Sequence, residues 1–345
     1  MHATNNCLTQ VEMIIVMQNT ATREMVDHVV KVVKDHGLNT EVMHGTSRVA
    51  IGVLGDKVKL EEGTILRQPG VKEILAVSKP YKKVSREYKI DDTVVTVAGK
   101  VKFGGDNPPV IIAGPCTVES QEQMTEIARG VKKLGAQMLR GGAFKPRTSP
   151  YAFQGHGVEG LKMLKKASQE VGLPVVSEIM SAEYLDEFME HVDMLQIGAR
   201  NMQNFDLLKA VSKVKKPVLL KRGMSATVEE FLLAAEYILA GGNDQVVLCE
   251  RGVRTFEQST RNLLDLNSLA LVKEISHLPI IADPSHAAGR YDIVPALGLA
   301  SLAAGANGLI IEVHHKPEEA LCDGKQSLTF ETMAEFMKKA RHFIG

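Results

Sequence analysis

The sequence predicts an α/β protein in which a (β/α)8 TIM barrel follows a small α+β ferredoxin-like domain. From residue 110 onwards, eight short apolar runs alternate with stretches whose apolar residues have helical spacing. These repeats extend over roughly 240 residues, and about 250 is usual for such a barrel. Before residue 80, strand-like and helical stretches instead follow the order βαββαβ, which is typical of a ferredoxin-like unit.

The composition is that of a globular chain and argues against two classes of partner. With 345 residues, 44% of them hydrophobic, the chain is long enough for two or three domains with large cores. Its 41 basic and 41 acidic residues cancel, whereas nucleic-acid binding needs a basic surface, so we expect no nucleic-acid partner. Apolar runs are far shorter than the ~18 residues of a membrane span, so no membrane partner is expected. The cysteines lack paired spacing and no signal-peptide pattern is visible, which predicts a cytoplasmic protein with reduced thiols.

The ferredoxin-like domain is expected over residues 13–78, after a flexible tail of residues 1–12. Helical spacing predicts one helix at residues 22–37, ended by Gly37, and a weaker one at residues 57–66. Apolar runs predict strands at residues 13–17, 40–44, 49–54 and 71–77. Such a domain leaves one sheet face open, and its edge strands can pair with another copy.

Residues 79–105 are expected to form a linker and a hairpin, interpreted as a lid, before a catalytic barrel over residues 106–345. Barrel strands are predicted to begin near residues 110, 138, 174, 194, 217, 245, 279 and 308. Helices are predicted at residues 122–134, 158–171, 227–239, 292–304 and 330–342. A doubly wound sheet is the alternative, but it normally has a glycine-rich nucleotide-binding turn where this chain has Gly114-Pro115-Cys116.

Every predicted barrel strand ends near a polar or reactive side chain. In a (β/α)8 barrel the functional residues lie at the carboxyl ends of the strands. Taken in order, these ends carry Cys116, Arg140, Glu178, Arg200, Lys221, Arg251, His286 and Glu312. A barrel with only a structural role has no need of eight such groups, so we expect an active site at this end.

One subset of these residues has the chemistry of a metal site. Cys116, His286 and Glu312 are common ligands, and Asp323 follows the last strand in a Cys-Asp-Gly turn. A thiolate, an imidazole and two carboxylates suit Mn, Fe, Co or Zn, whereas Mg and Ca prefer oxygen ligands alone. The remaining cysteines and three histidines in helical stretches are interpreted as tail, packing or surface residues: Cys7, Cys249, Cys322, His28, His36 and His191.

A second subset is basic and predicts a local cationic basin in a chain without net charge. It comprises Arg140, Lys145, Arg147, Arg200, Lys221, Arg222, Arg251 and Arg254. Surface salt bridges explain Arg222 and Arg254 better, because strand alternation points Arg222 away from Lys221. Arginine forks suit phosphate and carboxylate oxygens, and the number of cations is enough for two phosphates and a carboxylate. The residues therefore predict a metal-dependent enzyme acting on phosphorylated, anionic small molecules.

Several longer motifs resemble those of 3-deoxy-D-arabino-heptulosonate 7-phosphate (DAHP) synthases, the first enzymes of the shikimate pathway to the aromatic amino acids. The resemblance runs from about residue 94 to the carboxyl terminus. It rests on AGPC (113–116), LRGGAFKPRTSPY (139–151), QIGARNMQN (196–204), LLKRG (219–223), CERGVRTF (249–256), DPSH (283–286), EVH (312–314) and LCDG (321–324). The amino-terminal domain resembles the ACT-type regulatory domain of the type I beta subgroup.

The resemblance implies a condensation of phosphoenolpyruvate with erythrose 4-phosphate and water, which yields DAHP and phosphate. It implies a divalent metal on Cys116, His286, Glu312 and Asp323 that polarises the aldehyde. Lys145 would protonate the nascent alkoxide, and Glu178 would help to orient the attacking water. Substrate-binding roles are implied for Ala199, Arg200, Lys221 and Arg251 (phosphoenolpyruvate phosphate), Arg140 and Lys145 (its carboxylate), and Arg147 and Thr148 (erythrose 4-phosphate).

Two alternatives to this function are considered. 3-Deoxy-D-manno-octulosonate 8-phosphate synthases run the same chemistry on arabinose 5-phosphate, but they carry an Asn-Arg-Ser type loop where this chain has Lys-Pro-Arg-Thr. A non-catalytic sugar-phosphate sensor would have lost at least one ligand or phosphate-binding residue, and none is lost here.

The small domain is interpreted as regulatory, binding an aromatic amino acid between subunits of a homo-oligomer, with a tetramer as the expected size. In tyrosine-regulated relatives the second strand of this domain carries polar groups near the ligand's hydroxyl, where this chain has Glu41 and Met43. Since Met43 is a weak acceptor, tyrosine is disfavoured. Phenylalanine, another effector, no inhibition and a purely assembly role all stay open.

Overall fold

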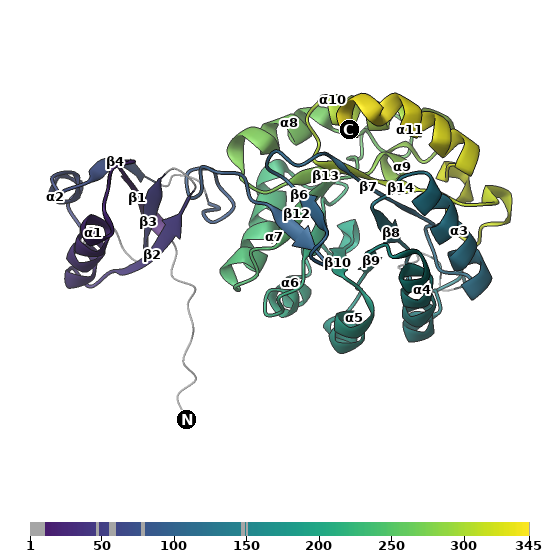
Figure 1. Ribbon diagram of the computed structural model, residues 1–345, viewed down its shortest axis with the longest axis horizontal. Helices are drawn as coiled ribbons and strands as arrows, with labels where there is room; N and C mark the ends of the chain where they lie inside the picture. Colours follow the sequence, from purple (N-terminus) through teal and green to yellow (C-terminus); the bar gives the residue numbers. More distant parts are fainter. Residues whose placement is uncertain are drawn as a thin grey trace. The chain divides into compact units, whose positions relative to one another are not determined.

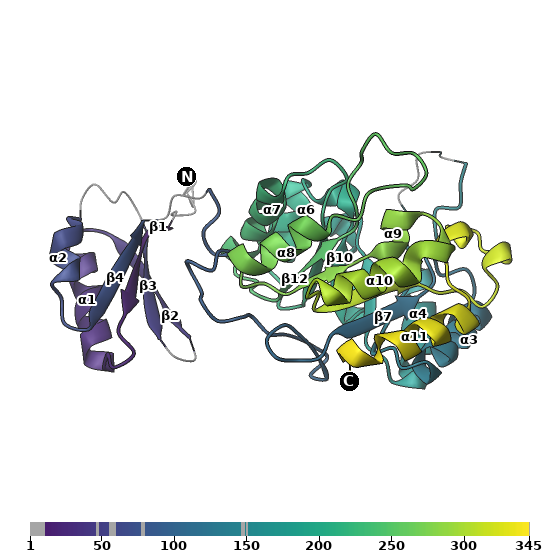
Figure 2. The same cartoon turned by 90° about the horizontal axis from the view of Figure 1, so that it is seen from above.

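The computed structural model describes residues 11–45, 48–54, 60–76, 80–145, 149 and 151–344. The chain divides into two compact units. The first comprises residues up to Asp92 together with Ile275–His277, and the second comprises Thr93–Glu274 and the chain from Leu278 onwards (Figures 1 and 2). Among the described residues, no helix is both long and apolar enough to cross a membrane.

The first unit is the expected ferredoxin-like sheet with two helices. Its order is β1 (Val11–Met17), α1 (Arg23–Asp35), β2 (Asn39–His44), β3 (Val49–Leu54), α2 (Glu62–Leu66) and β4 (Val71–Ala76). The sheet order is β2-β3-β1-β4, and every pair is antiparallel. The second helix was expected from residue 57, and residues 57–59 lie outside the described part of the chain.

Helix α1 forms because its apolar residues fall on one face and its amino terminus is capped. The Thr22 side chain accepts a hydrogen bond from the Met25 N–H, and Val26, Val29 and Val33 are buried. These valines pack with Met13, Ile15 and Met17, which alternate on one face of β1.

The opposite face of the sheet is partly covered by the segment that follows β4. Tyr88 packs against Ile14 and Val16, which point to that face. The same segment is tied to the short stretch 275–277, since Ser85 pairs with Ser276 and the His277 ring bonds the Lys83 carbonyl oxygen. The face that was expected to be open is therefore covered in part, because Tyr88 belongs to the same unit and lies on it.

The second unit is the expected barrel, and the doubly wound alternative is excluded. Its strands close in the order β10-β11-β12-β13-β14-β7-β8-β9, and neighbouring strands are parallel all round the barrel. They are β7 (Val110–Gly114), β8 (Met138–Arg140), β9 (Val175–Glu178), β10 (Met194–Ile197), β11 (Val218–Lys221), β12 (Val246–Glu250), β13 (Ile280–Ala282) and β14 (Gly308–Glu312).

Helices surround the barrel and bury the outer faces of the strands (Figure 1). They are α3 (Gln121–Lys133), α4 (Gly157–Val171), α5 (Leu185–His191), α6 (Phe205–Val211), α7 (Val228–Ala240), α8 (Leu266–Ile275), α9 (Pro284–Ala288), α10 (Val294–Ala303) and α11 (Phe330–Ile344). Because the strands are covered on both faces, β7, β12 and β14 are buried throughout and read as continuous apolar runs.

A hairpin of β5 (Val95–Val97) and β6 (Val101–Phe103) closes the amino-terminal end of the barrel. Val95, Val97 and Phe103 are fully buried and cluster with strand residues such as Val110 and Met194, which begin β7 and β10. The interpretation of this hairpin as a lid over the functional residues is therefore wrong. Its apolar side chains fill the opposite end of the barrel.

Candidate active site

A polar cavity of about 310 Å³ opens at the carboxyl ends of the barrel strands. Its lining includes most of the residues that the sequence pointed to, namely Arg140, Lys145, Glu178, Ala199, Arg200, Lys221, Arg251, His286 and Asp323. Gly114 permits the close approach of the first two strands, because a Cβ there would lie 2.2 Å from the Arg140 carbonyl oxygen. The loop that carries Cys116 and the strand that carries Arg140 are thus held side by side.

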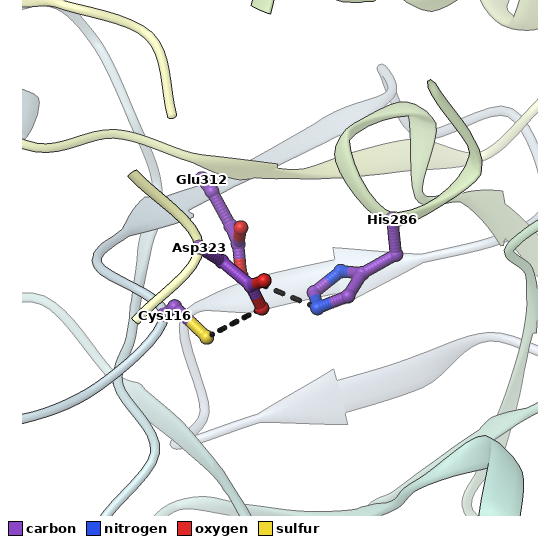
Figure 3. A group of neighbouring side chains, drawn as sticks. All are labelled: Cys116, His286, Glu312 and Asp323. Atoms are coloured by element: carbon purple, nitrogen blue, oxygen red, sulfur yellow. Dashed lines mark hydrogen bonds and ion pairs between the residues drawn. The ribbon is translucent and has the colours of Figure 1, made fainter. Parts of the chain in front are cut away.

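Cys116, His286, Glu312 and Asp323 converge on one point at the base of this cavity (Figure 3). Their candidate ligand atoms all lie within 4.8 Å of one another. The Cys116 Sγ is 3.2 Å from Asp323 Oδ2, and the His286 Nε2 is 3.2 Å from Glu312 Oε1. Glu312 Oε1 is buried and has no hydrogen-bond partner among the described residues. An uncommitted carboxylate oxygen beside an imidazole and a thiol fits a divalent transition metal.

Asp283 orients the imidazole of this group, and it was missed by the sequence reasoning. It is fully buried, accepts from Lys221 Nζ, and lies 2.7 Å from His286 Nδ1. Burial by itself would raise the pKa of Asp283, but the charges of His286 and Lys221 hold it well below its usual range. With Nδ1 bonded to a carboxylate, the His286 ring presents Nε2 to the other three ligands. The motif Asp-Pro-Ser-His, which places the pair three residues apart, was the available signal.

Arg140 is a buried cation with unpartnered nitrogens, which suits it to bind an anion. It is 5% exposed, and its Nη2 lies 3.2 Å from Glu312 Oε1. Its Nε and Nη1 are buried without a hydrogen-bond partner in the described part of the chain. Desolvation acts to lower the pKa of Arg140, but Glu312 and Cys116 raise it, so the guanidinium stays charged. Free nitrogen donors on a buried cation suit the oxygens of a carboxylate or phosphate.

The other predicted cations lie around the same cavity. Lys221 and Arg251 are buried, whereas Arg200 is exposed at the rim beside Ala199. Lys145 Nζ donates to the Cys116 Sγ at 3.0 Å and to the Cys116 carbonyl oxygen at 3.2 Å. Arg147 and Thr148 lie outside the described residues.

Glu178 is the acid of the cavity that stands apart from the metal-ligand group. Its Oε2 accepts from Gln196 Nε2 at 3.1 Å, and both residues line the cavity. A carboxylate held at this edge can accept a proton or orient a water molecule.

Cys322 differs from the expectation of a packing residue. Its Sγ is 3.2 Å from that of Cys116, and it lines the cavity. The hydrogen bond with Cys116 lowers the pKa of the Cys322 thiol. Cys249, by contrast, is fully buried, as a packing residue is expected to be.

The two arginines assigned to surface salt bridges also differ from expectation. Arg222 does form ion pairs, with Glu250 at 2.8 Å and Asp265 at 3.0 Å, but it is buried. Arg254 lines the cavity instead. Arg261, which the sequence reasoning missed, lies in the same loop, and its Nη2 is 3.2 Å from Asp323 Oδ1. Residues in a long irregular loop have no periodic pattern, so nothing in the sequence showed that the side chains of Arg254 and Arg261 point into the cavity.

Comparisons with known proteins agree with this geometry. The DAHP synthetase I family model matches residues 87–344, and the DAHP synthase ferredoxin-like domain matches residues 13–79. A phospho-2-dehydro-3-deoxyheptonate aldolase of Thermotoga maritima is 47% identical over 336 residues, which cover 96% of this chain and 99% of the relative. A 2-dehydro-3-deoxyphosphooctonate aldolase of Syntrophotalea carbinolica is 34% identical over 69% of this chain and 92% of its own length.

Solved structures give the same result. The crystal structure of the Thermotoga maritima DAHP synthase superposes with a TM-score of 0.75 at 46% identity, covering 96% of this chain and 97% of that one. A truncated form of the enzyme from the same organism gives a TM-score of 0.70 at 47% identity, covering 75% of this chain and 94% of that one. The family model covers most of the chain and the similarity includes both units, so this chain belongs to the DAHP synthetase I family.

Proposed function

We propose that this chain is a metal-dependent DAHP synthase, a transferase that joins phosphoenolpyruvate to erythrose 4-phosphate with the uptake of water. One observation carries the proposal: Arg140, a buried arginine with unpartnered nitrogens, lies beside a group of four candidate metal ligands, and Arg140, His286 and Asp323 line the same cavity. A cation-rich pocket next to a Lewis-acid site suits an anionic enol phosphate and an aldehyde together.

Members of this family depend on a metal, and the ligand set of this chain indicates which metals suit it. We assign Cys116, His286, Glu312 and Asp323 as the ligands. One thiolate favours Mn, Fe, Co or Zn over Mg or Ca. When bound, the metal supplies a Lewis acid that polarises the aldehyde oxygen of erythrose 4-phosphate.

The cations divide between the two ends of phosphoenolpyruvate. Arg140 and Lys145 would bind its carboxylate, because the Nε and Nη1 of Arg140 are free to donate hydrogen bonds to anionic oxygens. Arg200, Lys221 and Arg251 would bind its phosphate, with Ala199 beside them. These contacts hold C3 of the enol toward the aldehyde, and C3 supplies the electron pair of the new C–C bond.

In this assignment Lys145 donates a proton and Glu178 orients a water molecule. As C3 of phosphoenolpyruvate attacks the aldehyde carbon, the aldehyde oxygen becomes an alkoxide. Lys145 Nζ donates a proton to this alkoxide. Desolvation acts to lower the pKa of Lys145, but Cys116 raises it above the ordinary range, so Nζ carries its proton before the reaction. Glu178 orients the water that adds to C2, after which phosphate leaves by cleavage of the C–O bond.

Arg147 and Thr148 would bind the phosphate of erythrose 4-phosphate, a proposal that rests on the Lys-Pro-Arg-Thr motif. Replacing Arg147 by Ala removes a charge-assisted contact, which typically costs about 1.5–3 kcal/mol. The KM for erythrose 4-phosphate is expected to rise far more than that for phosphoenolpyruvate. Steady-state kinetics with each substrate varied in turn measures this, and equal effects would contradict the assignment.

The test of the function is phosphate release from phosphoenolpyruvate with erythrose 4-phosphate or arabinose 5-phosphate, with and without EDTA. We expect rapid release with erythrose 4-phosphate and loss of activity with EDTA that added Mn or Co reverses. Faster release with arabinose 5-phosphate would favour the octulosonate synthase, in line with the 34% identical relative. No release with either sugar would favour the sugar-phosphate sensor. We place the enzyme in the cytoplasm, where Cys116 stays a thiol.

A further inference from the structure

We propose that Gln326 is a positioning residue for the metal ligand Glu312 and restricts this carboxylate to binding through one oxygen. The inference rests on the proposed metal site. Gln326 is fully buried, lies 14 residues after Glu312 and does not line the cavity.

The two oxygens of Glu312 have different surroundings. Oε2 accepts a hydrogen bond of 2.5 Å from Gln326 Nε2. Oε1 accepts none among the described residues, and lies 3.2 Å from both Arg140 Nη2 and His286 Nε2. Because Gln326 occupies Oε2, only Oε1 is available to an ion between His286, Cys116 and Asp323.

The main chain of Glu312 is fixed as well, so the amide of Gln326 determines how the carboxylate is turned. The Glu312 N–H donates to Ser285 Oγ at 3.0 Å, and its carbonyl oxygen accepts from the Leu328 N–H at 2.8 Å. Leu328 is two residues after Gln326, and Val313 pairs with it as a parallel bridge. The segment that carries Gln326 is thereby held beside the end of β14.

Gln326 also contacts the second carboxylate ligand. Its N–H donates to the Asp323 carbonyl oxygen at 3.2 Å, across a turn in which Asp323 has a φ of 55°. A left-handed conformation is unfavourable for a residue with a side chain and persists when its surroundings fix it. One residue thus links two ligands that are contributed by different segments, Glu312 from β14 and Asp323 from the loop after it.

The amide has no other hydrogen-bonding role in the described residues. Gln326 Oε1 is buried and accepts no hydrogen bond there. A buried unpartnered carbonyl is unfavourable, and a glutamine used only for packing could be replaced by an apolar residue. The donor Nε2 is therefore the feature that requires glutamine. Partners of this kind tune metal affinity by roughly 10- to 100-fold in other proteins.

The test compares two substitutions of similar shape. Gln326→Met removes the donor, and Gln326→Glu places a second carboxylate against Glu312. Metal dissociation constants are measured by competition with a chelator, without substrate, together with the visible spectrum of the Co-loaded protein. We expect affinity to fall roughly 10- to 100-fold in Gln326→Met and further in Gln326→Glu, with a changed Co spectrum. Lys325→Met, at an exposed position of the same turn, is the matched control and should bind metal like the wild type.

The outcomes separate this inference from the proposed function. If the wild type binds no divalent metal, the proposed metal site fails. If the wild type binds metal and Gln326→Met binds it equally with an unchanged spectrum, only the role of Gln326 is overturned. A crystal structure of the metal-loaded wild type tests the geometry even if both variants fail to fold. Glu312 should then have one oxygen at about 2.0–2.2 Å from the ion and the other on Gln326, and two-oxygen binding would contradict the inference.

Discussion

Asp283 shows how a single buried charge organises the active site. Its carboxylate is out of contact with solvent and lies between Lys221 and His286. Removing one member of such a buried group leaves an uncompensated buried charge, which strongly destabilises the fold. Asp283, Lys221 and His286 are therefore stable at these positions only together. The same carboxylate therefore links the proposed phosphate-binding residue Lys221 to the proposed metal ligand His286.

Cys116 is the proposed ligand whose replacement gives the clearest test. Cys116→Ser keeps the size of the side chain but replaces the thiolate by a hydroxyl, which is a poor ligand at neutral pH. We expect metal affinity to fall sharply and turnover to be nearly abolished, while the thermal unfolding midpoint of the metal-free protein changes little. Metal analysis after dialysis, kcat with added Mn, and calorimetry measure the three quantities.

Cys249→Ser is the matched control, because it makes the same atomic change at a fully buried cysteine that lies outside the ligand group. It should keep its metal. Full activity of the wild-type enzyme after exhaustive chelation, with no metal detected, would contradict the metal assignment itself.

We expect Cys322 to make this site sensitive to oxidation. Its Sγ lies 3.2 Å from that of Cys116, and a disulfide needs about 2.05 Å, so a small movement joins them. Hydrogen peroxide oxidises one thiol to a sulfenic acid and releases one water, and the second thiol then attacks the sulfenic sulfur and releases a second water as the disulfide forms. We expect metal-free enzyme to lose two thiols and its metal affinity together, and dithiothreitol to restore both.

Bound metal should slow this oxidation, because it engages the Cys116 sulfur. Thiol titration and peptide mass spectrometry measure the pairing. In Cys322→Ser the disulfide cannot form, and a wild-type enzyme that loses metal affinity no faster than this variant would argue against the pairing.

At the scale of elements, the sequence predicted the strands and the residues at their ends better than the loops. A buried parallel strand is an apolar run, and the residue that ends it is visible in the sequence, as for Lys221 and Glu312. Cys322, Arg254 and Arg261 lie in loops, where direction depends on contacts between distant segments. The hairpin of β5 and β6 was misread for the same reason, since its alternating valines do not say which end of the barrel they enter.

The stretch 275–277 gives the first unit a pH-dependent contact. His277 is 4% exposed, and its Nε2 lies 2.6 Å from the Lys83 carbonyl oxygen. Burial lowers the pKa of His277 to about 4, against 6.5 in an unfolded chain. As the pH falls, the unfolded chain therefore takes up a proton on His277 at a higher pH than the folded chain does. The contribution of neutral His277 to the free energy of unfolding is complete above pH 6.5 and is lost as the pH falls toward 4.

We expect the stability of the wild type to fall more steeply between these pH values than that of His277→Gln, which keeps a donor and cannot ionise. Between these pH values the wild type should lose at most on the order of 3 kcal/mol more of its free energy of unfolding than His277→Gln does. Calorimetry from pH 7.5 to 4 measures it, with His28→Gln as an exposed control. Parallel pH profiles for the wild type and His277→Gln would contradict this.

At the scale of the whole molecule, the two units divide catalysis from the proposed control. The cavity and the proposed metal ligands all belong to the second unit. The described part of the first unit contains no group of three or more clustered ligand residues. A relative has been solved in a truncated form, and that form matches 75% of this chain. We propose that the small domain binds an aromatic amino acid in a homo-oligomer, with a tetramer as the expected size.

Deleting residues 1–80 should leave a metal-dependent synthase that is active but no longer inhibited. This cut keeps Lys83 and its hydrogen bond to His277, although it uncovers Tyr88. Inhibition requires the effector to prefer an arrangement in which the small domains restrict the cavity, because equal affinity for both arrangements shifts nothing.

Titration of the full-length and truncated enzymes with each aromatic amino acid tests this control. Because Met43 offers only a weak acceptor to a phenol hydroxyl, phenylalanine should inhibit the full-length enzyme at least as strongly as tyrosine. If the truncated enzyme responds like the full-length one, the effector binds the barrel. If neither form responds, assembly becomes the better account of the small domain, because its edge strands can pair with those of another copy.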